Sequence, residues 1–506
     1  MAHQRHLLGI DLGSSSVKVS VIDSGTGRCL GSSVSPEQEM EIQSANPGWA
    51  EQDPELWWEH VVLAIRHLLQ SDKFHANDIC AIGISYQMHG LVCIDDQHKV
   101  LRPSIIWCDS RAADIGRKAF HDIGPGYCLQ NFLNSPGNFT ASKLRWVIEN
   151  EPETYGKIFK IMLPGDYIAM KLTGSVCTTF TGLSEGIFWN FKENRLARKL
   201  LRYYDIDESL IPEPVSSFSH QGNLNASAAA ETGLKKGTKL TYRAGDQPNN
   251  AFSLNVLKPG EIAATAGTSG VIYGITDSPI YDEQSRVNSF VHVNHTPDTN
   301  RYGVLLCVNG TGILNSWLKK QLGLKQLPTY QDMNEKAAVA PIGSDGLIML
   351  PFGNGSERIL NDRNIGSHLH NLDFNRHQTS HLLRAAQEGI VFSLWYGLKI
   401  MKGMGLSISA IRAGHSNMFL SPVFRDAFVN TTGIPLEVYD TDGSQGAARA
   451  AGIGGDIYAD YPDAFMGLDR MQQLVPKPKK QQRYQEAYHR WVAVLEANLE
   501  HFDHSP

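Results

Sequence analysis

The sequence has few cysteines, and no two of them lie close together in the chain. Its seven cysteines stand singly, with no Cys-x-x-Cys motif, at positions 29, 80, 93, 108, 128, 177 and 307. Structural zinc sites and disulfide frameworks depend on closely spaced cysteines, so we expect neither. The pattern suits a reducing compartment, and no apolar secretion segment precedes the first predicted strand. We therefore expect a cytoplasmic protein.

Long apolar runs and an excess of basic residues are lacking as well. The longest apolar runs, such as 79–84, fall far short of the about 20 residues that a membrane-spanning helix needs. The net charge is −6, and binding to a phosphate backbone would need a basic stripe. The one basic cluster, 477–480, precedes a polar helix and is expected to be a solvated linker. We expect neither a membrane nor a nucleic acid as a partner.

Several common catalytic motifs are missing. No Gly-x4-Gly-Lys-Ser/Thr segment occurs, which excludes a P-loop, and neither His-Glu-x-x-His nor an Asp-rich calcium loop is found. One Gly-x-Ser-x-Gly segment spans 182–186. In a serine hydrolase this motif follows a strand and opens a helix. The residues after it, 187–191, are aromatic and strand-like instead, so we do not expect a serine hydrolase.

Strand and helix patterns alternate along the chain, whose 506 residues exceed one ordinary hydrophobic core. We expect an α/β protein with two large domains, 1–250 and 251–506. Strands are predicted at 7–11, 17–22, 81–85 and 240–244. Helices are predicted after residue 54 and near 141–150, 313–321, 380–402 and 482–500. The last helix could pack on the second domain or pair with a partner, so a homodimer stays open.

A weak internal repeat relates the two halves of the chain. The segment 261–275 reads as strand, glycine-hydroxyl turn and strand, like the segment 7–22. Three pairs of turn residues coincide, each 254 positions apart: Gly13 with Gly267, Ser14 with Thr268, and Ser15 with Ser269. Such turns present backbone N–H groups and hydroxyls, which suit phosphate. Two facing hairpins could hold a nucleotide's phosphates, although Gly-Ser turns are also ordinary hairpin chemistry.

Asp11 closes the first predicted strand, directly before the first turn. Its carboxylate could hold Mg²⁺ through water, because Mg²⁺ gives up its hydration shell reluctantly. Without a cation, a carboxylate next to a phosphate-binding turn would repel the phosphates, which favours the metal role. The alternative is an aspartate that only stabilises the turn.

Asp246 follows the strand predicted at 240–244 and precedes Gln247 and Pro248. It could accept the proton of a substrate hydroxyl as that oxygen attacks a phosphorus atom. An ordinary aspartate, with a pKa of about 4, is a weak base toward an alcohol. Because phosphoryl transfer is largely dissociative, orientation of the hydroxyl does most of the work. The alternative is an Asx-turn before Pro248.

Gln87, Met88 and His89 end a strand that is otherwise apolar. Glutamine and histidine side chains can hydrogen-bond a polyol, and so can backbone groups at the end of a strand. A lone histidine is more often structural than functional. The same reservation applies further along, where Asp109 and Arg111 could form a local ion pair.

Two glycine-containing segments, 310–312 and 413–417, precede helices predicted to start at 313 and 418. The N-terminus of a helix with small residues can bind an anion or the edge of a nucleobase. As capping motifs, the same residues need no ligand.

In order along the chain, these segments resemble the FGGY family of carbohydrate kinases, and the xylulokinases within it most closely. The resemblance spans 7–455 and rests on 9–15, 49–54, 87–90, 101–107, 139–144, 163–167, 244–246 and 266–270. Gln-Met-His-Gly at 87–90 and the stretch 101–107 favour the xylulokinases. The resemblance implies two ribonuclease-H-like domains of the actin/hexokinase/sugar-kinase superfamily, closing over an interdomain cleft. Sugar would bind mainly to the first domain and ATP mainly to the second.

The resemblance also implies roles for individual residues. Asp246 matches the proton acceptor, and Asp11 the carboxylate near Mg²⁺ and the γ-phosphate. Met88 and His89 match the sugar-contacting pair, and Gln247 stands where the family commonly has asparagine. The expected reaction is ATP-dependent phosphorylation of D-xylulose to D-xylulose 5-phosphate. A kinase for ribulose, gluconate or glycerol is the alternative, and a sensor that keeps the fold without catalysis is another.

On the nucleotide side, Thr268 and Gly312 match contacts to the phosphates, and Gly414 and Asn417 fall in the adenosine region. Ala-Gly-His at 413–415 replaces the family's usual run of glycines. The usual Gly-Glu-Arg-x-Pro pattern is also changed, at 355–359. These departures bear on nucleotide preference more than on the type of reaction.

Overall fold

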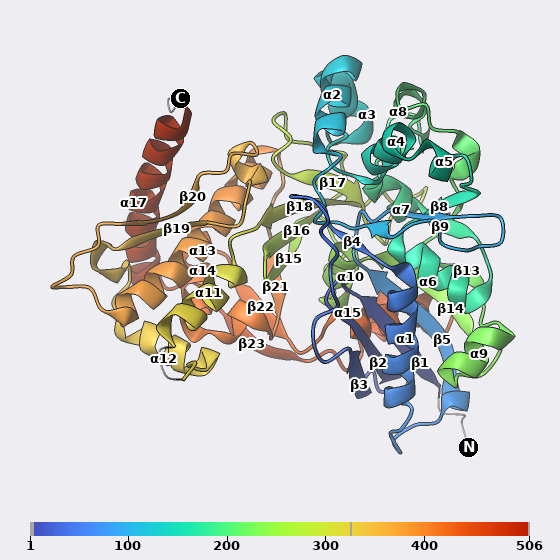
Figure 1. Cartoon of the computed structure of the whole chain (residues 1–506). Helices are drawn as coiled ribbons and strands as arrows, with labels where there is room; N and C mark the ends of the chain where they lie inside the picture. Colours follow the sequence, from blue (N-terminus) through green and yellow to red (C-terminus); the bar gives the residue numbers. More distant parts are fainter. Residues whose placement is uncertain (1–4, 324–325, 504–506) are drawn as a thin grey trace.

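The computed structural model describes residues 5–323 and 326–503. Two mixed β-sheets, one from each half of the chain, form its framework, with helices packed around them (Figure 1). The first sheet has six strands in the order β13-β14-β5-β1-β2-β3, and the second has seven in the order β17-β18-β16-β15-β21-β22-β23. This two-domain α/β architecture confirms the expected fold class.

The first sheet places three chemically distinct positions at one edge. β1 pairs parallel with β5, which pairs parallel with β14, so the carboxyl ends of all three strands point the same way. Asp11 lies at the end of β1, Gln87 follows β5, and Asp246 follows β14. The sheet consists of β1 (His6–Leu12), β2 (Val17–Asp23), β3 (Cys29–Ser35), β5 (Ile79–Tyr86), β13 (Phe218–Asn223) and β14 (Lys239–Gly245).

The second sheet repeats this arrangement. β15 is antiparallel to β16 and parallel to β21, as β1 is to β2 and β5. The predicted repeat is therefore confirmed in the structure, with the turns at 13–16 and 267–269 at equivalent places. The strands are β15 (Glu261–Ala266), β16 (Gly270–Thr276), β17 (Asn288–Val291), β18 (Tyr302–Val308), β21 (Ala410–Gly414), β22 (Leu436–Tyr439) and β23 (Arg470–Leu474).

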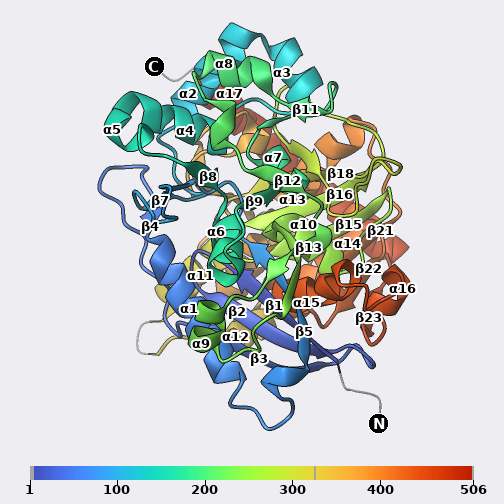
Figure 2. The same cartoon turned by 90° about the vertical axis from the view of Figure 1, so that its right-hand side faces the viewer.

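Helix α15 (Gly443–Gly454) comes late in the chain but packs on β1 and β5 of the first sheet (Figure 2). The contact is so close that two strand positions have no room for a side chain. A Cβ on Gly9 would lie 1.8 Å from the carbonyl oxygen of Ser444, and one on Gly83 would lie 2.1 Å from that of Ala447. The start of α15 is thereby held at the edge of the sheet where Asp11 lies.

Five of the helices predicted from the sequence are confirmed. They are α1 (Pro54–Leu68), α4 (Thr140–Asn150), α11 (Gly312–Leu322), α13 (Thr379–Gly403) and α17 (Pro478–Asp503). The Asp53 side chain begins α1 by accepting the N–H of Glu55 at 2.9 Å, and Pro54 occupies the first turn.

Shorter elements complete the described chain. The helices are α2 (Ala113–Ile123), α3 (Pro125–Phe132), α5 (Pro152–Tyr155), α6 (Pro164–Thr173), α7 (Phe180–Glu185), α8 (Arg198–Tyr203), α9 (Ala226–Thr232), α10 (Asp246–Ser253), α12 (Tyr330–Val339), α14 (Pro422–Thr432) and α16 (Tyr461–Ala464). The strands are β4 (Glu51–Gln52), β6 (Val92–Ile94), β7 (Ser104–Ile105), β8 (Lys160–Met162), β9 (Cys177–Thr179), β10 (Trp189–Asn190), β11 (Arg195–Leu196), β12 (Glu213–Val215), β19 (Ile348–Phe352) and β20 (Gly366–His370).

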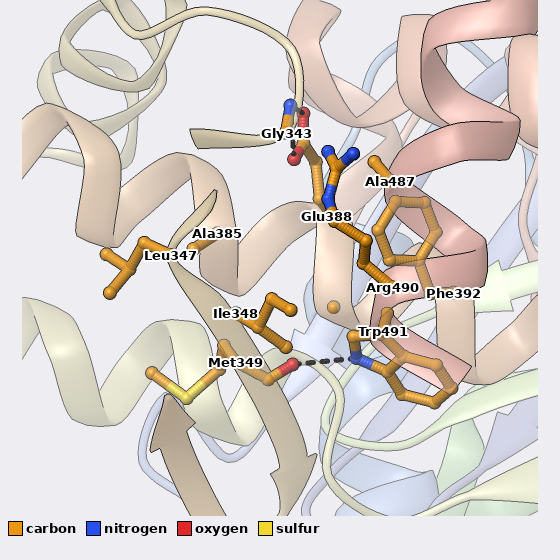
Figure 3. Close-up of a pocket in the computed structure, with 11 residues that line it drawn as sticks. Gly343, Leu347, Ile348, Met349, Ala385, Glu388, Phe392, Ala487, Arg490 and Trp491 are labelled. Atoms are coloured by element: carbon orange, nitrogen blue, oxygen red, sulfur yellow. Dashed lines mark hydrogen bonds between the residues drawn. The ribbon is translucent and has the colours of Figure 1, made fainter. Parts of the chain in front are cut away.

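The C-terminal helix α17 packs on the second half of the molecule. Its buried face carries Tyr484, Tyr488, Trp491 and Leu495, at the spacing of one helical stripe. The indole N–H of Trp491 donates to the carbonyl of Met349 in β19 at 2.9 Å (Figure 3). The crevice beside it holds only about 10 Å³, about the space of one water. The packing that the sequence left open is therefore intramolecular.

Two local expectations were wrong. The basic cluster 477–480 is not a free linker, because Lys480 lies in α17 and pairs with Asp426 at 2.8 Å. The helix expected to start at 418 is a single 3₁₀ turn, Asn417–Leu420. The α-helix starts later, where the Ser421 hydroxyl accepts the N–H of Phe424 and Pro422 opens α14.

In the described ranges, no helix combines the length and the apolar character that crossing a membrane requires.

Candidate active site

Asp11 and Asp246 lie near each other at the carboxyl edge of the first sheet. The Ser85 hydroxyl donates to Asp11 at 2.7 Å, and burial raises the pKa of Asp11 to about 6. Burial, followed by the charge of Asp11, raises the pKa of Asp246 to about 7. Each carboxylate is therefore harder to ionise than an ordinary aspartate. Two coupled carboxyl groups of this kind are typical of a functional site, where a proton or a cation relieves the repulsion.

The start of α15 closes one side of this pair. A Cβ on Gly443 would lie 2.3 Å from Asp11 Oδ2, so the backbone of this helix approaches the carboxylate directly. Asp442 caps the helix by accepting the N–H of Gln445 at 3.0 Å and pairs with Lys18 at 2.6 Å. The partial positive charge of the helix start thus faces Asp11.

The predicted sugar-side residues differ in their surroundings. Gln87 and Met88 are buried, and the Gln87 amide donates to Gln52 Oε1 at 3.4 Å. Gln87 therefore points into the first half of the protein. Met88 lies against the residue before Asp246, because a Cβ on Gly245 would lie 2.6 Å from Met88 Cγ. The structure thus places Met88 against Gly245, one residue before Asp246.

His89 is held in one tautomer by its neighbours. Its Nδ1 lies 2.9 Å from the carbonyl oxygen of Glu185, which can only accept, so Nδ1 carries the proton and Nε2 is an acceptor. Burial lowers the pKa of His89 to about 3, which keeps the ring neutral. Phe139 packs edge-on at 4.8 Å between ring centroids, and Phe290 of the second sheet lies at 5.5 Å. Both halves of the molecule therefore border this ring.

The backbone of His89 is in the left-handed region, with φ of 63°. Lys143, fully buried, donates to the carbonyl oxygens of His89 and Ile106, each at 2.9 Å. Burial lowers the pKa of Lys143 to about 8. Neither Lys143 nor Glu185 was predicted as a site residue. Both belong to segments that the sequence singled out for other reasons, 139–144 and 182–186.

The second sheet supplies the predicted phosphate-side residues. Gly267 and Thr268 accept the N–H groups of Gly312 and Ile313 at 2.9 and 3.1 Å, which ties the turn to the start of α11. A Cβ on Gly312 would lie 2.2 Å from the Gly267 oxygen, so only glycine fits there. The Asn417 amide nitrogen lies 3.5 Å from the Cβ position of Gly267. The predicted residues Gly267, Thr268, Gly312 and Asn417 therefore lie close together. Gly414 ends the neighbouring strand β21.

Ser14 and Ser15 contact the first half of the protein. The Ser14 hydroxyl accepts the indole N–H of Trp107 at 3.2 Å, and the Ser15 carbonyl accepts the N–H of Met40 at 2.8 Å. That the two hairpins act together on one ligand stays a prediction. The local ion pair expected between Arg111 and Asp109 is confirmed at 2.7 Å.

The segment 355–359, where the sequence departs from its resemblance, reaches both halves of the site. Glu357 is buried and accepts the N–H groups of Asn309 and Gly310 at 3.0 and 3.1 Å, which fixes the loop before α11. Burial raises the pKa of Glu357 to about 7. The Arg358 guanidinium lies 5.6 Å from the ring centroid of Phe139, which borders His89. Sequence reasoning treated this segment only as an altered motif.

The Gly-x-Ser-x-Gly segment is not a nucleophile elbow. Its first four residues lie inside α7, and the buried Ser184 hydroxyl accepts the N–H of Val291 at 2.9 Å. A serine held in this way is not exposed at a strand-to-helix turn, so the exclusion of a serine hydrolase is confirmed.

The carboxylates fit a magnesium ion that arrives with a phosphate ligand. Within residues 5–323 and 326–503, no three histidine, cysteine or acidic side chains are placed to hold a metal by themselves. Mg²⁺ usually keeps several waters and needs only one or two carboxylates together with phosphate oxygens. Asp11, with Asp246 beside it, provides such a donor set.

Comparison with known proteins gives consistent matches over nearly the whole chain. The family model described as "FGGY family of carbohydrate kinases, N-terminal domain" matches residues 6–253, and its C-terminal counterpart matches 262–454. The xylulose kinase of Haemophilus influenzae is 28% identical over 502 residues, covering 96% of this chain and 99% of the relative. The structure of a "xyloylose kinase" from Brucella ovis is 26% identical, with a TM-score of 0.87 over 97% of this chain and 99% of its own. A gluconate kinase from Lactobacillus acidophilus, 24% identical, shares the fold with a TM-score of 0.87 over 98% of both chains.

Proposed function

The chain belongs to the FGGY family of carbohydrate kinases, and we propose from this that it transfers the γ-phosphoryl group of ATP to D-xylulose, forming D-xylulose 5-phosphate. Membership of this family makes the chain a phosphotransferase. Xylulose kinases among its relatives, aligned over almost the full length, support D-xylulose as the acceptor.

The observation that carries the proposal is the position of Asp246. It lies next to Met88 through Gly245 on one side, and its pKa responds to the charge of Asp11 on the other. A single carboxylate therefore stands between the predicted sugar pair and the predicted metal carboxylate. This is where the acceptor hydroxyl of a sugar must meet the terminal phosphate of a nucleotide.

Asp246 would orient the acceptor hydroxyl and take its proton as the O–P bond forms. With a pKa of about 7, it is a stronger base than an ordinary aspartate and still ionises near neutral pH. The Gln247 amide donates to Asp246 Oδ2 at 3.2 Å, so the longer side chain at this position fixes the carboxylate. Proton transfer can be late because the transition state is largely dissociative.

The neighbouring groups would hold the two substrates in line. His89, neutral and protonated on Nδ1, presents Nε2 as an acceptor for a sugar hydroxyl. The turn 267–269, held in place by the start of α11, offers backbone N–H groups and hydroxyls to the phosphates. Mg²⁺ bound with ATP would be held by Asp11 through water and would offset negative charge on the transferring group. We also propose the cytoplasm as the compartment, which the seven unpaired cysteines of the described chain support.

A panel of sugars with Mg-ATP, followed by ADP release, tests the proposal. We expect kcat/KM to be highest for D-xylulose among xylulose, ribulose, gluconate and glycerol. A clearly higher value for another acceptor would replace xylulose by that acceptor. Gluconate is the acceptor to include first, because a gluconate kinase shares this fold. If no acceptor supports turnover, and calorimetry shows xylulose binding without nucleotide binding, the chain is a sensor and not a kinase.

A further inference from the structure

Glu185 contacts the predicted sugar site twice, although it lies in a segment that the reaction above does not use. It is the last residue of α7 and is buried. Its Oε1 accepts the backbone N–H of His89 at 3.3 Å, and its own carbonyl accepts the proton on His89 Nδ1 at 2.9 Å. One residue therefore holds both the backbone and the ring of His89.

These contacts act on a backbone that needs support. A histidine with φ of 63° is in a region that residues other than glycine adopt uncommonly, and the surrounding structure must hold it there. Glu185 holds the N–H of His89, and Lys143 holds its carbonyl oxygen at 2.9 Å. The conformation that presents Nε2 is thus fixed from both sides.

The second carboxyl oxygen of Glu185 faces the residue before Asp246. Oε2 is buried and has no hydrogen-bond partner within the described ranges. It lies 2.6 Å from the Cβ position of Gly245, the same position that Met88 Cγ approaches. Glu185 therefore lies between the predicted sugar pair and Asp246.

Among the described residues, no basic side chain forms an ion pair with Glu185. The two buried cations of this region have other partners: Arg243 of β14 pairs with Asp166 of α6 at 2.9 Å, and Lys143 donates to the carbonyl oxygens of His89 and Ile106. Besides His89, which donates its backbone N–H, the titratable groups coupled to Glu185 are Tyr86 of β5, Tyr273 of β16, Asp166 and Asp246. Burial first, then the carboxylates of Asp246 and Asp166, raise the pKa of Glu185 well above its usual range. Burial and these two carboxylates therefore disfavour a negative charge on Glu185.

We propose that Glu185 is a positioning residue for the sugar: it holds the backbone and the ring of His89 so that Nε2 is free to accept a sugar hydroxyl. This inference rests on the proposed function, because it assumes that the sugar binds at His89. No sequence motif predicted a role for Glu185, and no step of the proposed reaction uses its side chain directly.

Kinetics of two substitutions test the role. Replacing Glu185 with Ala should raise KM for D-xylulose by about tenfold, the equivalent of one lost hydrogen-bonded contact, with kcat changed much less. Replacing it with Gln should keep both constants within about threefold of wild type, because the amide reproduces a neutral carboxyl group in shape. An unchanged KM in Glu185→Ala would overturn the positioning role. Loss of activity in Glu185→Gln as large as in Glu185→Ala would overturn it as well, because glutamine keeps an acceptor for the His89 N–H.

Ser184→Ala is the matched control. It removes a buried side-chain contact from the same helix without touching His89, since Ser184 contacts Val291. We expect lower thermal stability and an unchanged KM. If Ser184→Ala raised KM as much as Glu185→Ala, the effect would be a general disturbance of α7, and the proposal would fail.

Nitrogen-15 NMR of the histidine rings provides a readout that needs no sugar. The His89 signal, identified by its loss in His89→Asn, should show a neutral ring protonated on Nδ1 in wild type at pH 7. A ring protonated on Nε2, or on both nitrogens, would contradict the Glu185 contact. This measurement separates the two hypotheses: if no sugar supports turnover, the proposed function fails, while the tautomer still reports whether Glu185 fixes His89. If a sugar other than xylulose is turned over, the kinetic tests use that sugar.

Discussion

At the level of single residues, two buried histidines connect the stability of the protein to pH. Burial lowers the pKa of His89 in the first half, and of His292 in the second, to about 3. His292 is fully buried and contacts the Tyr273 hydroxyl at 3.3 Å through Nδ1. Unfolding returns each ring to water, where its pKa is about 6.5. Below that pH the unfolded chain takes up protons that the folded chain does not.

We therefore expect these two histidines to lower the free energy of unfolding as the pH falls from 7.5 to 5, whereas the raised pKa values of Asp11, Asp246 and Glu357 act in the opposite direction over the same range. The folded-state pKa of each histidine is depressed, so its stabilising contribution is present above the unfolded pKa and is lost toward acid pH. Each histidine should account for about 2 kcal/mol of that loss, since one pKa unit corresponds to about 1.4 kcal/mol. The free energy of unfolding of wild type minus that of His292→Asn, measured in urea at both pH values, should fall by about 2 kcal/mol from pH 7.5 to pH 5.

His220→Asn is the control for this prediction, because His220 is exposed. It should leave the pH dependence of unfolding as in wild type. An equal pH dependence in wild type and His292→Asn would show that His292 does not stay neutral in the folded protein.

The residues of the site were predictable from the sequence where they follow a strand. Asp11 and Asp246 end or follow parallel strands, and such strand ends meet at one edge of a sheet. Glu185 and Lys143 were not predictable, because they reach His89 across 96 and 54 residues of chain. The ordinary pKa assumed for Asp246 was also wrong, because burial and Asp11 act on it only in the folded protein.

At the level of elements, the position of Asp11 depends on how α15 lies on the first sheet. Gly9 and Gly83 allow this helix to touch β1 and β5 through backbone atoms. At the start of the helix, Gly443 allows the backbone to approach Asp11. Glycines in the strands therefore bear directly on the geometry of the site.

Replacing Gly9 with Ala should destabilise the protein and lower its activity. The new Cβ would lie 1.8 Å from a backbone oxygen of Ser444, and relief requires β1 or α15 to move. We expect a loss of about 1–3 kcal/mol or more, the usual range for overpacking a core. Thermal melting measures the loss, and ADP release measures the effect on Asp11.

Gly126→Ala is the matched control, because a Cβ there would meet no atom within 4 Å and the backbone is not in a glycine-only conformation. It lies in helix α3, where alanine is the better helix former. We expect unchanged or slightly raised stability. A Gly9→Ala protein as stable as Gly126→Ala would show that α15 does not press on β1.

Elements with a strong period were predictable, and those defined by capping were less so. The hairpins at 7–22 and 261–275 and the long helices follow from periods of two and of 3.6. The start of α14 was misplaced because Gly414 suggested a helix start, while Ser421 and Pro422 carry the actual capping signals. The packing of α17 was not predictable, because its polar composition hides the stripe formed by its buried aromatic residues.

At the level of the whole molecule, both halves contribute to one site. Phe290 of the second sheet borders His89, and Arg358 lies over Phe139 of the first half. In the other direction, α15 carries the chain back from the second half to Asp11. Contacts between residues more than 200 positions apart cannot be predicted from local sequence patterns. The internal repeat and the resemblance to the FGGY family were what indicated two similar domains around one site.

The proposed phosphoryl transfer, to which both halves of the molecule contribute, depends on the carboxylate of Asp246. Asp246 begins α10, the helix that leads from the first sheet toward the second. Asparagine in its place keeps the shape and the contact with Gln247 but cannot accept a proton. The Asp246→Asn protein should fold as wild type does, because burial already makes the Asp246 carboxyl group difficult to ionise and the neutral amide has a similar shape.

The decisive measurement is xylulose-dependent ADP release by Asp246→Asn beside wild type, with binding of xylulose and Mg-ATP followed by calorimetry. We expect the rate to fall by about 100-fold or more, the usual contribution of a general base, while both ligands still bind. Turnover at the wild-type rate in Asp246→Asn would contradict the account.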